Sequence, residues 1–253
     1  MAARTLASAP RHIATAACIR AGHVARARCL VASATATSQQ TSVISSVPAG
    51  LAELLQSGSK LTTAAKTAWT QFLRPGDTVV DATCGNGHDT LFLAQAVGPS
   101  GHVIAFDIQE AAISATRQRL EASLPPGRLP RLELHAACHS RLQELAGSGV
   151  ARLVVFNLGY LPGADKSLIT STATTSAALE AALEVVEPGG LISILCYVGH
   201  PGGMEEYNAV RQICAELKPA YWATSETRLL NRPTAPVLVL LWRCSEPFFG
   251  RRS

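Results

Sequence analysis

Residues 78–91 read TVVDATCGNGHDTL, and this stretch decides the fold. The β-branched, apolar run 78–80 predicts a short buried strand that ends at Asp81. Gly85 and Gly87 then open a tight turn, and a helical pattern begins at about Thr90. A buried strand that ends in a carboxylate and turns through glycines into a helix is typical of a site for a nucleotide-like ligand.

The residues around this turn favour a positively charged ligand. A second strand, 102–106, ends at Asp107, where an acid suits a ribose diol. The third glycine of the dinucleotide fingerprint is missing, because Thr90 stands in its place. Asp81 and Asp89 would repel phosphates and attract a cation or an amine. We therefore favour S-adenosylmethionine, which has an ammonium, a sulfonium and a ribose but no phosphate, over a nicotinamide or flavin. A purely structural turn is the alternative.

The charge is distributed unevenly along the 253 residues, a length sufficient for one substantial core. The formal net charge of +4 is due to the first 52 residues, which contain five arginines and no acid. The remaining chain has 17 basic and 18 acidic side chains. A nucleic-acid surface would therefore have to be a local patch.

The N-terminal stretch has the composition of an organelle transit peptide, since it is arginine-bearing, free of acids and rich in Ala, Ser and Thr. Its hydroxyl-rich run 33–46 favours the chloroplast, with the mitochondrion as second choice. A tail without a targeting role is the alternative. We expect a disordered transit peptide over 1–47, one domain over 48–246 and a tail over 247–253.

Two kinds of feature are not expected. The chain has no apolar run of 18 residues, so we predict no membrane span. The five cysteines after residue 50 are scattered and form no Cys-x-x-Cys pair, which argues against a metal site or a disulfide framework and for a reducing compartment.

Strands and helices alternate five times along the chain, which predicts a parallel sheet with right-handed crossovers and an α/β fold. A turn is expected at 187–190, between the helix 172–186 and the strand 191–197. The expected strands are 78–80, 102–108, 132–136, 153–156, 191–197, 221–229 and 236–243, and the expected helices are 51–73, 89–96, 109–123, 142–145, 172–186 and 204–217.

The fourth strand leads into a second candidate site, with the sequence FNLGYLPGADK over 156–166. In open α/β sheets the ligand lies beyond the carboxyl ends of the strands, so this loop should border the cofactor. Asn157 can accept a hydrogen bond through its amide oxygen, Gly159 permits close approach, and Tyr160 can stack on a flat ring. The loop resembles the Asn-Pro-Pro-Tyr motif with which amino-group methyltransferases orient the target amine. A structural turn with a packed tyrosine is the alternative.

Three motifs together resemble the MnmM family, also called YtqB and formerly described as rRNA methylases. They are DATxGNGHDT, FNLGYLPGxDK and YxGHxGG, within about residues 50–243. The sequence departs from the family at Ala164 and in the triplet Ala-Cys-His at 137–139. The resemblance implies a Rossmann-like class I methyltransferase with a seven-stranded, mostly parallel sheet, an antiparallel last strand and helices on both faces. It also implies that S-adenosylmethionine is the cofactor. The implied activity is N-methylation of 5-aminomethyl-uridine to 5-methylaminomethyl-uridine at the tRNA wobble position.

The same resemblance implies the site residues. Asn157 and Tyr160 would meet the target amine, and Asp165 or His200 could accept its proton. As alternatives, Asp165 could pair with Lys166 and His200 could simply follow a strand end. The substrate side past the fifth strand would hold Tyr197, Gly199, His200 and Gly202. The cofactor-binding set is Asp81, Gly85, Asn86, Gly87 and Asp89 at the methionine end, Asp107 and Gln109 at the ribose, and Cys138 and His139 at the adenine.

The implied partner is the anticodon stem-loop of a tRNA. The basic side chains that could form a patch are Arg228, Arg232, Arg243, Lys166 and Arg251-Arg252, although such charges are often only a solvated surface. The Phe248-Phe249 pair could contact substrate or mediate a homodimer. The competing functions are methylation of rRNA or of a small primary amine, nicotinamide-dependent reduction, and a catalytically silent binding protein. The missing third glycine disfavours the reductase, and the intact loop 157–160 disfavours the silent protein.

Overall fold

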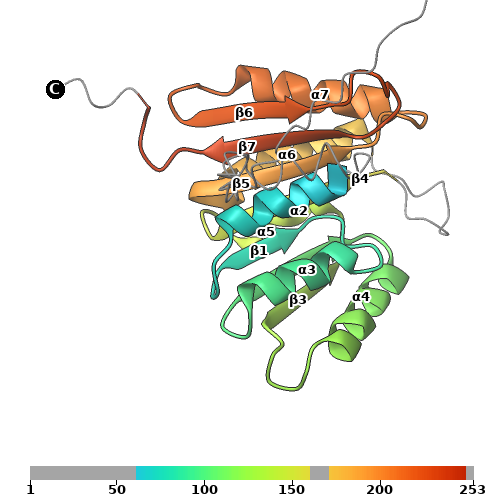
Figure 1. Ribbon diagram of the computed structural model, residues 1–253, viewed down its shortest axis with the longest axis vertical. Coiled ribbons are helices and arrows are strands. Elements are labelled where there is room, and N and C mark those ends of the chain that lie inside the picture. Colours follow the sequence, from blue (N-terminus) through green and yellow to red (C-terminus); the bar gives the residue numbers. More distant parts are fainter. Residues whose placement is uncertain (1–60, 160–170, 249–253) are drawn as a thin grey trace, which may run out of the picture. The chain divides into compact units, whose positions relative to one another are not determined.

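A computed structural model of the protein describes residues 61–159 and 171–248. These residues form a seven-stranded sheet in the order β3-β2-β1-β4-β5-β7-β6 (Figure 1). The strands are β1 (Thr78–Asp81), β2 (His102–Asp107), β3 (Arg131–Ala136), β4 (Ala151–Leu158), β5 (Val186–Cys196), β6 (Trp222–Thr227) and β7 (Val237–Arg243). The helices are α2 (Leu61–Phe72), α3 (His88–Val97), α4 (Glu110–Ser123), α5 (Leu142–Ala146), α6 (Thr172–Val185) and α7 (Gly203–Glu216), with a 3-10 turn, η1 (His139–Arg141).

The pairing of the strands confirms the predicted α/β fold. Strands β1 to β5 pair in parallel, whereas β7 pairs antiparallel with both β5 and β6. From β1, the chain adds β2 and then β3 on one side of the sheet. It then returns to the centre and places β4 and β5 on the other side, so the strand order reverses between β1 and β4. In such sheets a ligand site lies outside the carboxyl ends of the strands at this reversal.

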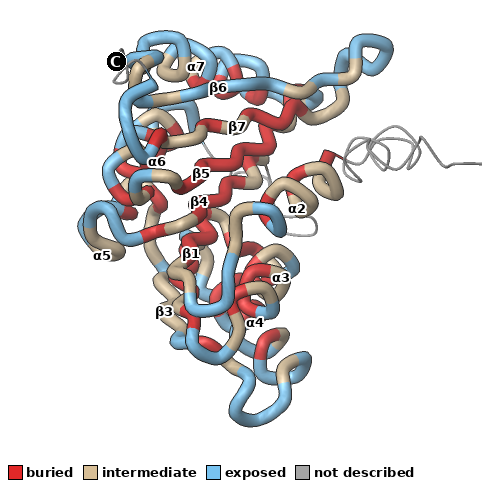
Figure 2. The backbone as a smooth tube through the Cα atoms, turned by 60° about the vertical axis from the view of Figure 1, so that its left-hand side comes forward, coloured by how far each residue is buried: buried red, intermediate tan, exposed pale blue. Residues whose placement is uncertain are grey.

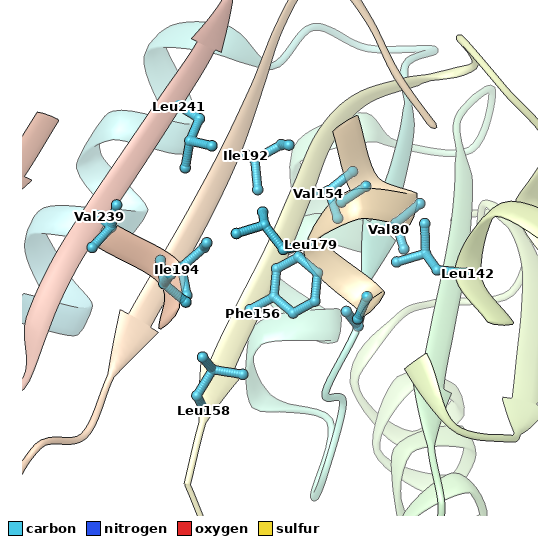
Figure 3. Packing of buried hydrophobic residues seen from close by; sticks show 14 of the residues in the cluster. Val80, Leu142, Val154, Phe156, Leu158, Leu179, Ile192, Ile194, Val239 and Leu241 are labelled. Carbon is cyan, nitrogen blue, oxygen red and sulfur yellow. The ribbon is translucent and has the colours of Figure 1, made fainter. Parts of the chain in front are cut away.

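Helices cover both faces of the sheet. On one face, side chains of β4, β5 and β7 such as Phe156, Ile194 and Val239 pack with Leu179 of α6 and with residues of α5 and α7 (Figure 3). On the other face, α2, α3 and α4 pack against the same sheet, and Trp69 of α2 is fully enclosed there. Figure 2 shows that burial is concentrated along the central strands. Since each fully buried large side chain contributes about 1.5–3 kcal/mol, these central strands are the rigid part on which the loops are mounted.

The start of β5 differs from the prediction. A turn at 187–190 was expected before a strand at Leu191, but α6 passes directly into β5 at Val186. The register with β4 shifts here, from Ala151 opposite Val186 to Leu153 opposite Leu191. The four residues 187–190 therefore form an irregularity within the strand, of the kind that a β-bulge produces. The boundary was missed because Pro-Gly-Gly is typical of turns as well as of bulges.

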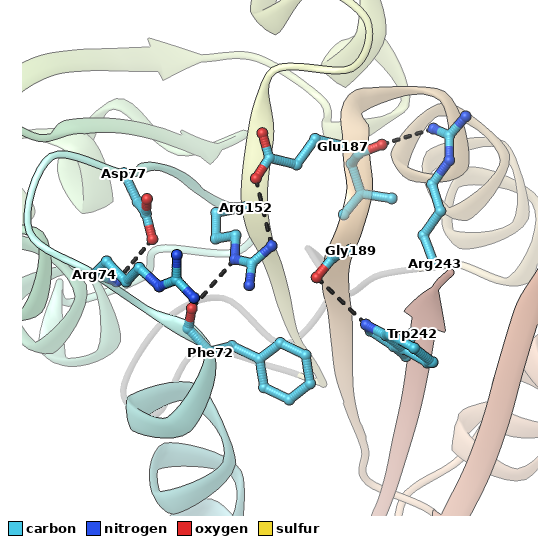
Figure 4. Close-up of polar contacts among 9 residues, drawn as sticks. Phe72, Arg74, Asp77, Arg152, Glu187, Gly189, Trp242 and Arg243 are labelled. Carbon is cyan, nitrogen blue, oxygen red and sulfur yellow. Dashed lines mark hydrogen bonds and ion pairs between the residues drawn. The ribbon is translucent and has the colours of Figure 1, made fainter. Parts of the chain in front are cut away.

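Side chains of neighbouring strands hold this irregular segment (Figure 4). Trp242 Nε1 donates to the Gly189 carbonyl oxygen at 3.3 Å. Arg152 lies 3.6 Å from the Glu187 carboxylate and donates through Nε to the Phe72 carbonyl oxygen at 3.2 Å. These contacts connect the end of α2 and the start of β5 to β4. They lie at the end of the sheet where the parallel strands begin, opposite their carboxyl ends.

The remaining expectations about organisation lie partly outside the described residues. Residues 1–47, the first part of the predicted helix 51–73 and the tail beyond residue 248 are among the residues that the structure does not describe. Within the described ranges, no helix has the length and apolar character needed to cross a membrane.

Candidate active site

A cavity of about 680 Å³ lies beyond the carboxyl ends of β1, β2, β4 and β5. Its volume is within the range of ligand and cofactor sites. Every described strand of the parallel part of the sheet contributes. The lining residues lie at or after the carboxyl ends of β1 (82–86, 88, 89), β2 (107–109), β3 (137–139), β4 (157, 159) and β5 (197, 200), together with Ser171 and Thr174 at the start of α6. Among these described lining residues there is no lysine or arginine. A phosphate would therefore find no lysine or arginine here, and it would meet the carboxylates of Asp107 and of Asp89, the latter paired with Lys66.

The turn between β1 and α3 brings bare backbone to the cavity. Gly85 and Gly87 have φ of 50° and 77°, a left-handed region that is costly for other residues. A Cβ on Gly87 would lie only 2.8 Å from Thr116 Cα. Helix α4 fixes the turn, because Thr116 Oγ1 donates to the Gly85 carbonyl oxygen at 3.0 Å and Arg119 Nε to that of Asn86 at 2.5 Å.

Asp81 holds this turn from within the protein and does not line the cavity. It is 1% exposed, and its carboxylate accepts from Thr90 Oγ1 at 2.6 Å and from the Thr83 backbone N–H at 3.1 Å. Burial, followed by the nearby Asp89 carboxylate, raises the pKa of Asp81 to about 7. Thr90, which replaces the third glycine of the dinucleotide fingerprint, is thus the partner of this buried acid. Both Asp81 and Gly87 were predicted to contact the cofactor, and the structure places both behind the wall of the cavity.

Asp107 is presented to the cavity by backbone contacts. One carboxylate oxygen accepts from the Gln109 N–H at 2.9 Å and the other from the Gly85 N–H at 3.0 Å. These two bonds fix the orientation of the carboxylate and leave acceptor positions on both oxygens. Such a group suits two vicinal hydroxyls, as the sequence predicted for a ribose.

The part of the cavity past β2 and β3 is largely apolar. Ile108 lines it between Asp107 and Gln109. Its exposed fraction of 51% is unusually high for an isoleucine. His139 packs edge-on against Phe156 at 6.0 Å between ring centroids, and burial lowers the pKa of His139. A neutral His139, Cys138 and Ile108 together form a wall that suits a flat, uncharged ring.

Asn157 lies near the end of β4 with its amide in a fixed orientation. Its backbone N–H donates to Thr83 Oγ1 at 2.7 Å, and its side-chain Nδ2 donates to Asp89 Oδ2 at 3.2 Å. Because a carboxylate can only accept, the amide NH2 group must face Asp89, and the amide oxygen therefore faces away from it. The acceptor atom predicted to meet a target amine is thus set by its neighbours.

The segments after β4 and β5 meet beside Asn157. A Cβ on Gly159 would lie 3.5 Å from the Tyr197 ring, so the glycine brings this backbone close to the ring. Burial, followed by the Asp89 charge, raises the pKa of Tyr197, so it is an uncharged phenol at neutral pH. His200 Nδ1 lies 2.9 Å from the Pro201 carbonyl oxygen, to which it can only donate. In neutral His200 this bond places the basic lone pair on Nε2.

Most of the predicted site residues are brought together. The cavity is lined by Gly85, Asn86, Asp89, Asp107, Gln109, Cys138, His139, Asn157 and His200. Tyr160 and Asp165, also predicted, lie outside the described residues. The prediction missed Thr83, Cys84, His88, Ile108, Ser171 and Thr174, all of which line the cavity. Ser171 and Thr174 form a capping box at the start of α6, and their sequence Ser-x-x-Thr carries no signal that they line a cavity.

Of the predicted basic patch, Lys166 and Arg251-Arg252 lie outside the described residues, and the other three arginines are divided between two ends of the sheet. Residue Cys196 pairs with Val237 across β5 and β7, so the loop 228–236 lies at the end of the sheet where the cavity opens, and it carries the exposed Arg228 and Arg232. Arg243 lies at the other end of β7, where its Nη1 donates to the Val186 carbonyl oxygen at 2.7 Å (Figure 4). The inclusion of Arg243 in a patch near the cavity was therefore wrong.

The chain is similar to several known proteins over much of its length. A family model described as "Putative rRNA methylase" matches residues 103–243. The chloroplastic tRNA (mnm(5)s(2)U34)-methyltransferase of Arabidopsis thaliana is 43% identical over 190 residues, which cover 73% of this chain and 69% of that protein.

Solved structures resemble the described fold as well. A Clostridium thermocellum protein described as an rRNA-methylase is 36% identical with a TM-score of 0.66, over 71% of this chain and 95% of that one. The Streptococcus mutans protein SMU.1697c, described as a methyltransferase and solved in complex with SAH, is 34% identical with a TM-score of 0.63, over 71% and 95% of the two chains. The similarity therefore extends far beyond the stretch 78–91.

Proposed function

Because the chain belongs to the rRNA methylase family, which is the MnmM family that its motifs resemble, we propose that it N-methylates 5-aminomethyl-uridine at the tRNA wobble position. The chain is a methyltransferase, and S-adenosylmethionine is its cofactor. The observation that carries the finer proposal is the orientation of Asn157, whose amide oxygen is turned away from Asp89 at the rim of the cofactor cavity.

The described residues fit the cofactor in three places. Asp107, oriented by two backbone N–H groups, would hold the ribose hydroxyls. The glycine turn at 85–87 would let the methionine portion approach the backbone, and the apolar wall with Ile108 would cover the adenine. When bound, S-adenosylmethionine supplies an electrophilic methyl group on a sulfonium.

Asn157 would orient the acceptor amine. Its amide oxygen, with the neighbouring Leu158 carbonyl, would accept the two N–H bonds of the amine and aim the lone pair at the methyl carbon. The new N–C bond forms as the S–C bond breaks, and the bonding electrons stay on sulfur. Orientation of this kind can supply roughly 7–11 kcal/mol of a barrier in favourable cases. His200, which lines the cavity, would accept the amine proton, directly or through water.

The loop 228–236 supports a nucleic-acid substrate. It joins β6 to β7 at the end of the sheet where the cavity opens, and it carries Arg228, Arg232 and Leu230, the last of which is 91% exposed. Two exposed arginines at this end of the sheet suit phosphates that flank a flipped-out base.

The similarity to a chloroplastic tRNA methyltransferase also supports tRNA and the chloroplast as partner and location. Residues 1–47 would then serve as the transit peptide. A fusion of these residues to a fluorescent protein should enter chloroplasts, and a fusion that stays in the cytosol or enters mitochondria would contradict the location.

The substrate is tested by nucleoside mass spectrometry. The full chain is incubated with S-adenosylmethionine and a tRNA whose wobble base is 5-aminomethyl-uridine, in parallel with the same tRNA carrying plain uridine, with rRNA and with a small primary amine. We expect 5-methylaminomethyl-uridine from the first substrate alone. Methylation of rRNA or of the free amine, with none on the tRNA, would favour the alternative reading.

A further inference from the structure

An ion pair between Lys66 and Asp89 connects helix α2 to the candidate amine site. Lys66 Nζ of α2 lies 2.8 Å from Asp89 Oδ1, while Asp89 Oδ2 accepts from the Asn157 amide. Lys66 does not line the cavity. The three side chains form a chain of contacts that runs from α2, through the start of α3, to the end of β4. The Asn157 amide, which also hydrogen-bonds with the Tyr197 side chain, is thereby linked through Asp89 to a helix that does not line the cavity.

The position of Lys66 is itself fixed by packing. Helix α2 is anchored by Leu61, Ala65 and Trp69, all of which are buried against the sheet. The Lys66 ammonium also lies 5.3 Å from the centroid of the Phe92 ring, a cation–π distance. Lys66 is only partly exposed, with 31% of its side-chain surface accessible, and Asp89 has 17%. The pair is thus less screened than an ordinary surface ion pair.

Several charged or titratable groups surround Asp89. Asp81 at the end of β1 and Tyr197 after β5 both interact electrostatically with its carboxylate. His88 precedes it on α3, and His88 and His200 share the cavity with it. Among the residues that the structure describes, Lys66 is the cation paired with Asp89.

We propose that Lys66 is a positioning residue for the target amine: it compensates the charge of Asp89, the acceptor of the Asn157 amide, so that the bound amine is not held as an ammonium. This inference rests on the proposed amine N-methylation. An alkyl amine has a pKa near 10.4 and attacks only when neutral. An amine hydrogen-bonded to the Asn157 oxygen lies within roughly 8 Å of the Asp89 carboxylate, since each hydrogen bond spans about 3 Å. An uncompensated carboxylate at that range stabilises the ammonium and raises the pKa of the amine by about one unit.

The test compares Lys66→Met with Lys66→Arg in the full chain, with tRNA that carries 5-aminomethyl-uridine. We expect Lys66→Met to lower kcat at pH 7 about tenfold, and to move the pH of half-maximal kcat up by about one unit. Its kcat should approach that of the wild type at high pH, where the amine is neutral in both. Lys66→Arg keeps the charge and should retain the wild-type pH profile.

Two further readouts separate this role from a structural one. Affinity for S-adenosylhomocysteine, measured by calorimetry, should change less than about threefold, and the melting temperature of Lys66→Met should fall by about 3 °C or less. Arg131→Met removes a more exposed ion pair with Glu133, on the edge strand β3 and outside the cavity lining, and should leave the kcat profile unchanged. In Lys66→Met/Asp89→Asn, the uncompensated charge is gone, so the pH of half-maximal kcat should return to the wild-type value even if kcat stays low.

The outcomes are distinguishable. If the wild type does not methylate the aminomethyl tRNA, the proposed function fails and the role of Lys66 fails with it. If the wild type is active but Lys66→Met loses the same fraction of kcat at every pH, or loses none, the role of Lys66 alone is overturned. A double variant that keeps the shifted profile would also overturn it, because the shift would then have another cause than Asp89.

Discussion

At the scale of single residues, the site depends on acids whose environments differ sharply. Asp107 is oriented by backbone N–H groups and faces the cavity, Asp89 is paired with Lys66, and Asp81 is buried beneath the turn. Their sequence positions alone suggest one common role near the cofactor. The structure separates them because Thr90 provides a buried hydroxyl partner for Asp81 alone.

Asn157 should be essential for turnover and dispensable for cofactor binding. Asn157→Ala removes the amide oxygen that would aim the amine, and a misplaced nucleophile costs about 100-fold or more in rate. We expect kcat to fall by at least that factor, while calorimetry with S-adenosylhomocysteine gives an affinity within about threefold of the wild type. Unaltered turnover would refute the role of the amide oxygen in orienting the amine.

The buried Asp81 predicts an unusual pH dependence of stability. Its pKa is raised from 3.8 to about 7, so the folded protein holds this proton where the unfolded chain has lost it. The contribution to folding is complete below the unfolded pKa and is lost as the pH rises towards 7, by roughly 3–5 kcal/mol. Asp81→Asn, which keeps the shape, should remove this dependence. Urea unfolding from pH 4 to 7 measures it, and parallel curves for the two proteins would contradict the raised pKa.

The sequence predicted those site residues whose chemistry is visible in their type and position. Asp107 follows a strand and Gly85 opens a turn, and both patterns are read directly from the chain. Ile108 was missed, because an apolar residue is expected to be buried and nothing in the sequence marks it as exposed. Lys66 was missed because its partner, Asp89, is 23 positions away, and the helix that carries it precedes the ligand-binding strands.

At the scale of elements, boundaries were predicted well where the apolar residues follow one helical or strand periodicity. They were predicted less well where turn residues occur inside a strand. Helix α4 and strand β3 lie within one or two residues of their expected ranges. The start of β5 was misplaced because its Pro-Gly-Gly segment bulges within the sheet, where Trp242 holds it. The antiparallel position of β7 between β5 and β6 could be expected only from the family resemblance, because strand pairing over such distances leaves no local signal.

The loop 228–236 should act on tRNA binding and not on the chemical step. Replacing Arg228 and Arg232 with glutamine removes two phosphate partners, which should raise KM for tRNA about tenfold and reduce the salt dependence of binding by about two counterions. We expect kcat and the affinity for S-adenosylhomocysteine to stay within about twofold. Kinetics at several salt concentrations measure this, with Arg131→Gln at the opposite edge of the sheet as control. An unchanged KM would exclude this loop from the tRNA interface.

At the scale of the whole described domain, the order of the strands determines where the chemistry takes place. The reversal between β1 and β4 leaves an opening at the carboxyl ends of the strands, and the turns after β1, β2 and β3 would supply the side that we propose for the cofactor. The ends of β4 and β5 would supply the side that we propose for the amine. The alternation of strands and helices was sufficient to predict a site at the carboxyl ends of the strands. The side-chain contacts that orient the cavity residues could be seen only in the packed structure.

A crystal structure with S-adenosylhomocysteine tests the central claim most directly, namely that the cofactor and the amine meet between Asp107 and Asn157. The account predicts the ribose on Asp107 and the sulfur roughly 5–8 Å from the Asn157 amide oxygen, the span of a methyl group, a nucleophile at contact distance and one hydrogen bond. A sulfur atom that points away from Asn157, more than about 10 Å from its oxygen, would contradict the account, because no amine held there could reach the methyl group.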